Sequence, residues 1–273
     1  MNSSDLRKEA RNKLSGKWGK AALIALAYAV VFIVIDLVSR HLPESAQSIV
    51  SLIVTIIEIP LAFGLLLSLF KLYNDEEVNA FDFLSLGFSN FKKSWAVSLR
   101  IFVKMILPII LLIVSIALII GGLVGTNTAL LSDALSTSNI ASLSASTTGK
   151  LSGVAILGFI LYIVSIIWLI VRSYSYQLAF VIAADDDDLS SKEAIDRSAK
   201  LMNGNRWKLF CLQFSFIGWA IIACFTLGIG MLWLAPYIQF AIFAFYKYLN
   251  VDSKTVAEDT TSSVEDNINN PEK

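Results

Sequence analysis

The sequence predicts an all-α polytopic membrane protein, with six transmembrane helices arranged as three hairpins and with short amphipathic helices on the cytoplasmic side. Three observations support this fold class. Hydrophobic residues make up 56% of the chain and charged residues only 16%, whereas about a quarter of the residues of a soluble domain are charged. The apolar residues gather in long runs, and the basic residues gather at alternate ends of those runs. These features indicate that lipid surrounds most of the chain.

The apolar runs define the predicted spans. A window of about 19 residues selects four separate runs and one run of roughly twice the length that crosses a hydrocarbon core. Gly228-Ile229-Gly230, near the middle of the long run, can supply a turn that divides it into two helices. The six predicted spans are residues 21–38, 49–70, 99–122, 151–171, 209–227 and 231–249.

The basic residues predict the orientation of these spans. Of the 22 Lys and Arg residues, only Arg40 and Lys150 lie on one side of the predicted bundle. Because Lys and Arg accumulate in cytoplasmic loops, both termini are predicted to be cytoplasmic. A cleaved signal peptide is the alternative reading of the first run. The long basic leader, and the lack of a small-x-small site that closes the run cleanly, argue against it.

The leader, residues 1–20, is predicted to be basic and amphipathic, with a helix that Ser3 or Ser4 caps and that ends at about Ser15, before Gly16. Apolar residues recur in it every four positions, at Leu6, Ala10, Leu14 and Trp18. Such a helix is suited to lie on an anionic leaflet; the alternative is an ordinary solvated leader. The residues predicted to lie at the lipid interface are Arg7, Lys8, Arg11, Lys13, Lys17, Trp18, Trp95, Arg206 and Trp207.

A second cytoplasmic helix is predicted over residues 190–203, between spans 4 and 5. Ser190 and Glu193 match a capping box, and the four residues Asp185–Asp188 precede it, where the helix dipole favours negative charge. A metal site is the alternative reading of these aspartates. Consecutive side chains point in different directions and no second set of ligands lies nearby, so the sequence predicts helix capping, with no metal and no cofactor.

Two further segments are predicted to lack a fixed structure. Residues 125–149 are rich in Ser, Thr and Ala, which predicts a mobile outer loop with room for a short helix. Residues 250–273 are polar and acidic, which predicts a disordered cytoplasmic tail.

Polar residues inside the predicted spans are the candidate functional residues. Glu58 lies near the middle of the second span, where a carboxylate costs roughly 2.5–3.5 kcal/mol on insertion scales. Pro60, two residues later, frees a backbone carbonyl one turn back. Lys104 either pairs with Glu58 or extends to the cytoplasmic interface; Gln213 and Gln239 complete the set. Glu58 is read either as functional or as a structural carboxyl bonded to a neighbouring helix.

Two hairpins share a pattern that predicts an internal repeat. Gly, basic and Trp residues precede spans 1 and 5, in "GKWGKAAL" and "NGNRWKLF". Pro60 precedes Lys71 by the same spacing as Pro236 precedes Lys247, each within an aromatic exit. Parallel duplication explains this pattern. Convergence on the residues that membrane interfaces favour is the alternative.

The stretches "LRKEARNKLSGKWGKAAL" and "EAIDRSAKLMNGNRWKLFCLQFSFIGWAIIACFTLGIGMLWLAPYIQFAIFAFY" resemble an uncharacterised integral membrane family of Gram-positive bacteria, domain-of-unknown-function family 975. The resemblance covers most of the chain and implies a protein of the bacterial cytoplasmic membrane. It implies no activity and no catalytic residues.

Two functional hypotheses follow. In the first, the bundle interior around Glu58 handles a small molecule, a lipid or an ion. In the second, the protein is a scaffold, an assembly factor or a regulator that acts through its basic helices. An enzyme is not expected, because the sequence lacks H-E-x-x-H, G-x-S-x-G and any His/Cys/carboxylate cluster. The expected partners are anionic lipid and a membrane protein or a second copy of the chain, with no nucleic acid.

Overall fold

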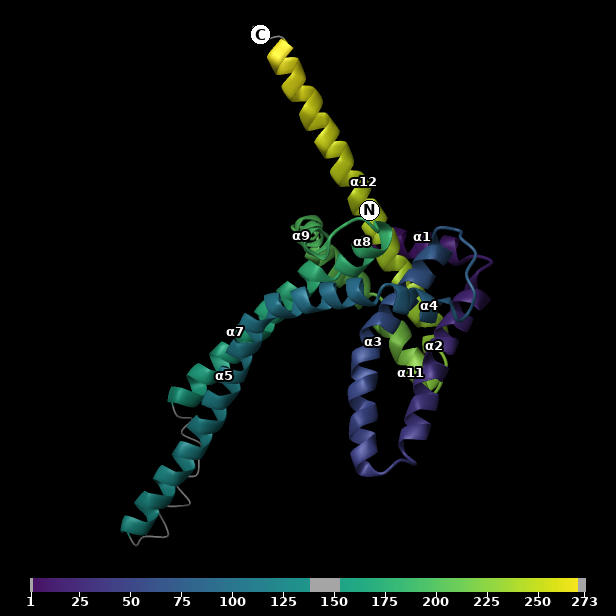
Figure 1. Ribbon diagram of the computed structural model, residues 1–273. Helices are drawn as coiled ribbons and strands as arrows, with labels where there is room; N and C mark the ends of the chain where they lie inside the picture. The colour runs from purple at the N-terminus through teal and green to yellow at the C-terminus, as the bar shows by residue number, and fades with distance from the viewer. Residues whose placement is uncertain (1, 138–152, 270–273) are drawn as a thin grey trace. The chain divides into compact units, whose positions relative to one another are not determined.

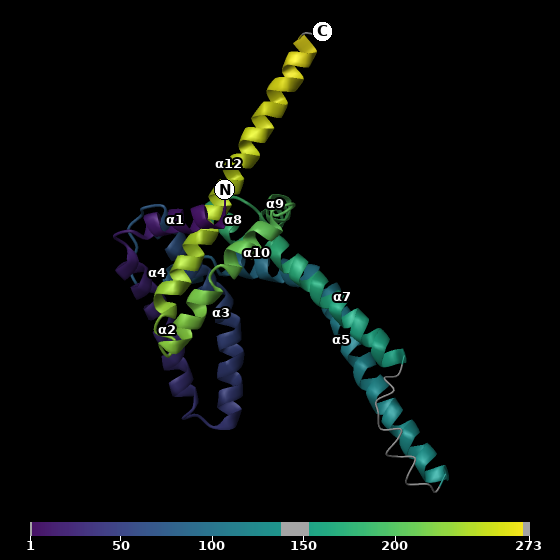
Figure 2. The same cartoon turned by 180° about the vertical axis from the view of Figure 1, so that it is seen from behind.

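The computed structural model describes residues 2–137 and 153–269, and every regular element within them is an α-helix (Figure 1; Figure 2 shows the reverse view). The predicted all-α class is therefore confirmed for these ranges. The helices are α1 (Ser3–Leu14), α2 (Trp18–Ser39), α3 (Glu44–Tyr73), α4 (Asp82–Ser89), α5 (Phe91–Thr137), α7 (Gly153–Tyr176), α8 (Ala179–Asp185), α9 (Ser191–Leu201), α10 (Arg206–Phe214), α11 (Ile217–Phe225) and α12 (Met231–Asn269).

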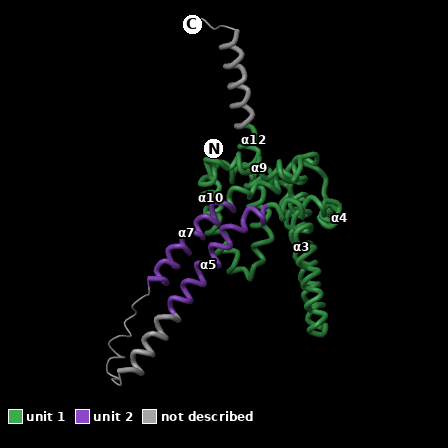
Figure 3. Tube along the Cα trace, turned by 60° about the vertical axis from the view of Figure 1, so that its left-hand side comes forward, with its two compact units in different colours: residues 1–100, 174–273 green, residues 101–173 purple. Residues whose placement is uncertain are grey.

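The chain forms two compact units, which Figure 3 colours separately. Unit 1 comprises residues 1–100 and 174–273, and unit 2 comprises residues 101–173. In unit 2, α5 and α7 approach closely at Gly158, where an added Cβ would lie 2.8 Å from the backbone nitrogen of Ile119. Ser115 and Ser165 are buried in the same unit. Small residues of this kind let membrane helices pack closely.

Five helical segments of the described chain are long and apolar enough to cross a membrane. They are Trp18–Ser39, Glu44–Tyr73, Phe91–Leu123, Gly153–Asp185 and Arg206–Phe225. In each, the most apolar window is at most 22% buried within the protein, as expected when lipid covers the remainder. These segments extend beyond most of the predicted runs, because a hydropathy window selects the apolar centre of a helix and not its polar ends.

The fifth predicted span, residues 209–227, is not one continuous helix. It is divided into α10 and α11 at Ser215 and Phe216. The hydroxyl of Ser215 donates to the carbonyl of Leu212 at 2.6 Å, and side-chain bonds of this kind compete with helical ones and bend helices. The predicted turn is confirmed, since α11 ends at Phe225 and α12 begins at Met231.

The sixth predicted span, residues 231–249, is helical but is not among the five segments. It carries Pro236, Gln239 and Lys247, and the run Phe240–Tyr246 is buried on every side by other helices of unit 1. The number of six spans therefore stays a prediction.

Helix α4 packs against α3 through two glycines. A Cβ on Gly64 would overlap the carbonyl oxygen of Phe83 and would lie 2.7 Å from the nitrogen of Gly87. A Cβ on Gly87 would lie 2.6 Å from the carbonyl oxygen of Pro60. The backbones of the two helices are therefore in direct contact, and Phe83 is buried in a core with Leu61 and with Ala27 of α2.

The predicted cytoplasmic helix between spans 4 and 5 is α9. Ser190 caps it, because its hydroxyl accepts a hydrogen bond from the backbone nitrogen of Glu193. The carboxylate of Glu193 in turn accepts a hydrogen bond from the backbone nitrogen of Ser190 at 3.0 Å. These bonds from Ser190 lower the pKa of Glu193. The capping box is thus confirmed.

The segments predicted to lack fixed structure are only partly described. Helix α5 continues to Thr137, into the predicted outer loop, and α12 continues to Asn269, into the predicted tail. The rest of both segments lies outside the described residues.

Candidate functional site

The predicted intramembrane polar residues are not gathered in one site. Glu58 lies exposed on α3 and forms no hydrogen bond or ion pair within the described parts of the chain. Gln213 accepts a hydrogen bond from the Tyr174 hydroxyl at 2.9 Å, and Gln239 lines a cavity of about 190 Å³ between α2, α3 and α12. Lys104 belongs to unit 2, so its pairing with Glu58 stays a prediction.

Pro60 does free a carbonyl, and the structure shows which group satisfies it. A residue at position 60 with an N–H would donate to the carbonyl of Ile56, four residues earlier. Proline has no N–H, and the indole Nε1 of Trp95 donates to this oxygen instead, at 3.1 Å. Trp95, which the sequence predicts to lie at the lipid interface, thus ties the start of α5 to the proline site of α3.

Replacement of Trp95 by Phe should lower the free energy of unfolding by about 1 kcal/mol, the usual net value of a hydrogen bond. In a Pro60→Ala background the new N–H can take the Ile56 carbonyl, so the same replacement should cost much less. Denaturant unfolding of the four proteins in one detergent measures this coupling. An equal loss in both backgrounds would contradict the assignment.

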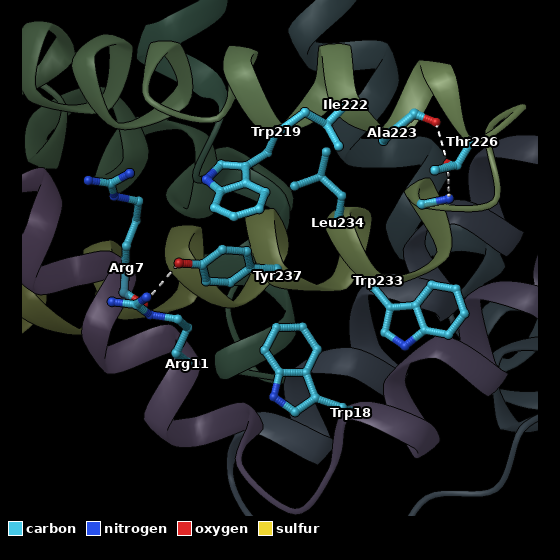
Figure 4. A pocket seen from close by; sticks show the side chains of 11 residues that line it. Arg7, Arg11, Trp18, Trp219, Ile222, Ala223, Thr226, Trp233, Leu234 and Tyr237 are labelled. Carbon is cyan, nitrogen blue, oxygen red and sulfur yellow. Dashed lines mark hydrogen bonds between the residues drawn. The ribbon is translucent and has the colours of Figure 1, made fainter.

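A groove of unit 1 lies between α1, the start of α2, α11 and α12, and we call it the leader groove (Figure 4). Its volume is about 420 Å³, within the range of about 300–1,000 Å³ typical of small-molecule sites. The lining residues are Arg7, Arg11, Trp18, Trp219, Ile222, Ala223, Thr226, Gly230, Trp233, Leu234 and Tyr237.

The leader groove has one cationic end. Figure 4 shows the guanidinium groups of Arg7 and Arg11 on the side to which the hydroxyl of Tyr237 points. That hydroxyl donates to the backbone carbonyl of Arg7 at 3.3 Å. The Nε of Arg7 is buried without a hydrogen-bond partner, and neither arginine forms an ion pair with a side chain of residues 2–123 or 153–251. Buried donors are normally satisfied, so this end of the groove lacks an acceptor.

The rest of the groove is aromatic and aliphatic. Trp18, Trp219 and Trp233 occupy its body, and the Trp18 and Tyr237 rings lie 5.8 Å apart. The far end is closed by the hairpin, where Thr226 accepts from the nitrogen of Gly230 at 2.8 Å. A cationic end joined to an apolar body is complementary to an anionic amphiphile.

Helix α1 forms one wall of the groove because its apolar face packs on protein. Leu6, Ala10 and Leu14 are at most 2% exposed, and α1 contacts α10 and α12. The predicted apolar face is therefore confirmed for Leu6, Ala10 and Leu14, whereas Trp18 begins α2. Protein covers the face for which the sequence predicts a lipid leaflet. This packing turns Arg7 and Arg11 toward the groove.

A polar clasp holds the end of α1 against the end of α3. Asp75 accepts from Lys13 at 3.0 Å and from Lys17 at 2.5 Å, and Lys17 also donates to the carbonyl of Leu72 at 2.7 Å. The hydrogen bonds from Lys17 and Lys13 lower the pKa of Asp75 to about 2. The clasp therefore stays charged at physiological pH.

The other residues predicted for the lipid interface have different surroundings. Lys8 is exposed. Trp207 is also exposed and stacks on Phe210. The Nε of Arg206 is buried without a partner. Only Arg7, Arg11 and Trp18 of that predicted set line the groove. Trp219, Trp233 and Tyr237 were not among the predicted residues; the signal for the last two was their four-residue spacing on one helix face.

Two of the four aspartates bond to side chains of other helices. In the described part of the chain, no group of three His, Cys, Asp or Glu residues is placed to hold a metal. Asp185 instead accepts from the Tyr246 hydroxyl and from Lys247, both at 2.7 Å, and Asp187 pairs with Lys93 at 3.2 Å. The aspartates thus tie α8 and its following loop to α5 and α12.

Comparison with known proteins identifies a family and no individual relative. The model of a family described as "Protein of unknown function (DUF975)" matches residues 1–253. No curated protein and no solved structure matches the chain.

Proposed function

The chain belongs to the DUF975 family, and we propose that it is a non-enzymatic integral protein of the bacterial cytoplasmic membrane that binds an anionic amphiphile in the leader groove. The observation that supports this proposal is the joining of an unpaired cationic end, Arg7 and Arg11, to an aromatic body. A membrane-dissolved amphiphile has the same division between charge and hydrocarbon.

The proposed topology has six membrane helices in three hairpins, with both termini in the cytoplasm. It rests on the concentration of Lys and Arg on one side of the bundle, since such residues remain cytoplasmic. In this topology α1 lies at the cytoplasmic surface, so the arginines meet the headgroups of the inner leaflet and the tryptophans meet its acyl chains.

The groove supports this function better than Glu58, because Glu58 itself lines none of the described cavities. The second hypothesis, a scaffold that acts through its basic helices, is less favoured, because two of the basic residues of α1, Arg7 and Arg11, line the groove.

Native mass spectrometry of the protein, purified from its own membranes in mild detergent, tests the proposal. We expect the wild-type protein to retain an anionic amphiphile, and the Trp219→Ala/Trp233→Ala variant to lose most of it. Trp168→Ala is the matched control, because Trp168 lies on α7 and does not line the groove. A wild-type protein without any bound amphiphile, or equal retention by the groove variant, would overturn the proposal.

A further inference from the structure

The cationic end of the leader groove carries two positive charges, those of Arg7 and Arg11, whereas a carboxylate ligand would bring one negative charge. Arg7 and Arg11 are four residues apart, so they project from one face of α1, and the hydroxyl of Tyr237 points toward them. No carboxylate of the described chain pairs with either guanidinium. The buried Nε of Arg7 has no acceptor.

We infer that the leader groove binds a lipid whose headgroup ends in a phosphate monoester. This inference rests on the proposed function and specifies its ligand. A phosphate monoester carries a charge of about −1.5 to −2 at pH 7 and presents three acceptor oxygens. A carboxylate or a phosphodiester carries one negative charge and presents two free oxygens, so it leaves one arginine without a counter-charge.

The geometry of the donors favours phosphate in the same way. Each guanidinium is a planar fork that binds phosphate oxygens in pairs, and the bond from the Tyr237 hydroxyl to the Arg7 carbonyl holds this turn of α1 beside the groove. Two forks from successive turns of one helix can hold different oxygens of a tetrahedral group. A planar carboxylate has too few oxygens for both.

The body of the groove excludes a purely polar ligand. Beyond the arginines, the lining residues are mainly aromatic and aliphatic, and none of them is charged. A free phosphate ion would leave this apolar volume of the groove empty of ligand. An acyl or prenyl chain attached to the phosphate would fill it and would remove the indole rings of Trp219 and Trp233 from solvent, which is favourable in proportion to the area covered.

The test uses the full chain in neutral phosphatidylcholine nanodiscs. The groove tryptophans report binding of phosphatidic acid with brominated chains, because bromine quenches indole fluorescence on contact. Phosphatidylglycerol with the same brominated chains, a phosphodiester, is the matched lipid. We expect phosphatidic acid to bind at least about tenfold more tightly, the equivalent of one charged hydrogen bond.

Variants of α1 locate the headgroup. Arg7→Gln and Arg11→Gln should each weaken binding of phosphatidic acid about tenfold, while Lys8→Gln, on the exposed face of the same helix, should not change it. Arg7→Lys retains the positive charge but lacks the planar guanidinium, so its loss of affinity for phosphatidic acid should be intermediate. Thermal unfolding of each variant in the same nanodiscs shows whether it remains folded.

The possible outcomes separate the two proposals. Equal binding of the monoester and the diester overturns this inference and leaves the proposed function intact. Binding of neither lipid overturns both. If inorganic phosphate protects α1 from proteolysis while brominated lipid causes no quenching, the arginines bind a free anion and the lipid assignment is wrong.

Discussion

Gly64→Ala is expected to lower the free energy of unfolding by about 3 kcal/mol, the upper part of the usual range for an overpacked site. The added Cβ meets the carbonyl oxygen of Phe83 and the backbone nitrogen of Gly87. Both are main-chain atoms, so no side-chain rotation relieves the overlap and α4 must move away from α3. Denaturant unfolding in detergent measures the loss.

The matched control is the same substitution at a glycine with open space around it. Gly218 lies inside α11, and a Cβ there meets no atom within 4 Å. Gly218→Ala should raise stability by about 0.5–1 kcal/mol, because alanine loses less backbone freedom in a helix. If Gly64→Ala also raises stability, the close contact between α3 and α4 is wrong.

The helical architecture could be read from the sequence because its signals are local. Long apolar runs, the turn at Gly228 and the capping box of Ser190 and Glu193 each depend on residues close together in the chain. The division of the fifth span at Ser215 was not predicted, because a hydropathy window averages over a single serine. The environment of residues 231–249 was not predicted either, because hydropathy does not distinguish burial by protein from burial by lipid.

The leader groove could not be predicted from the sequence, because it is formed by residues far apart in the chain. The periodicity of Leu6, Ala10 and Leu14 predicts an apolar face, and it does not specify what covers that face. Since α10 and α12 cover it, Arg7 and Arg11 face a groove rather than a leaflet. Only this packing brings them close to Tyr237.

Glu58 shows the opposite limit of sequence reasoning. A carboxyl within an apolar run is a sound functional candidate, because its burial in lipid is costly. In the structure it lies exposed on α3, and the polarity created by Pro60 is satisfied by Trp95. The presence of a charged residue in an apolar run therefore identified an unusual position. A site with a cavity could be found only from the packing of the helices.

Leu14→Asp is expected to release α1 from the rest of unit 1. Leu14 is 0% exposed, so the substitution removes a buried side chain, which costs about 2–5 kcal/mol, and places a carboxylate in an apolar contact. A loss of about 3 kcal/mol raises the population of undocked α1 more than about a hundredfold. Trypsin cleavage after Arg7 and Arg11 in nanodiscs should rise accordingly.

The control for this experiment is Lys8→Asp, which changes charge on the exposed face of α1 and should leave the helix protected. Leu14→Asp retains both groove arginines, yet it should abolish amphiphile binding, because an undocked helix no longer presents them beside Tyr237. Protection of α1 in Leu14→Asp would show that the clasp of Asp75 with Lys13 and Lys17 suffices to dock it. Loss of protection with binding retained would show that α1 is not a wall of the site.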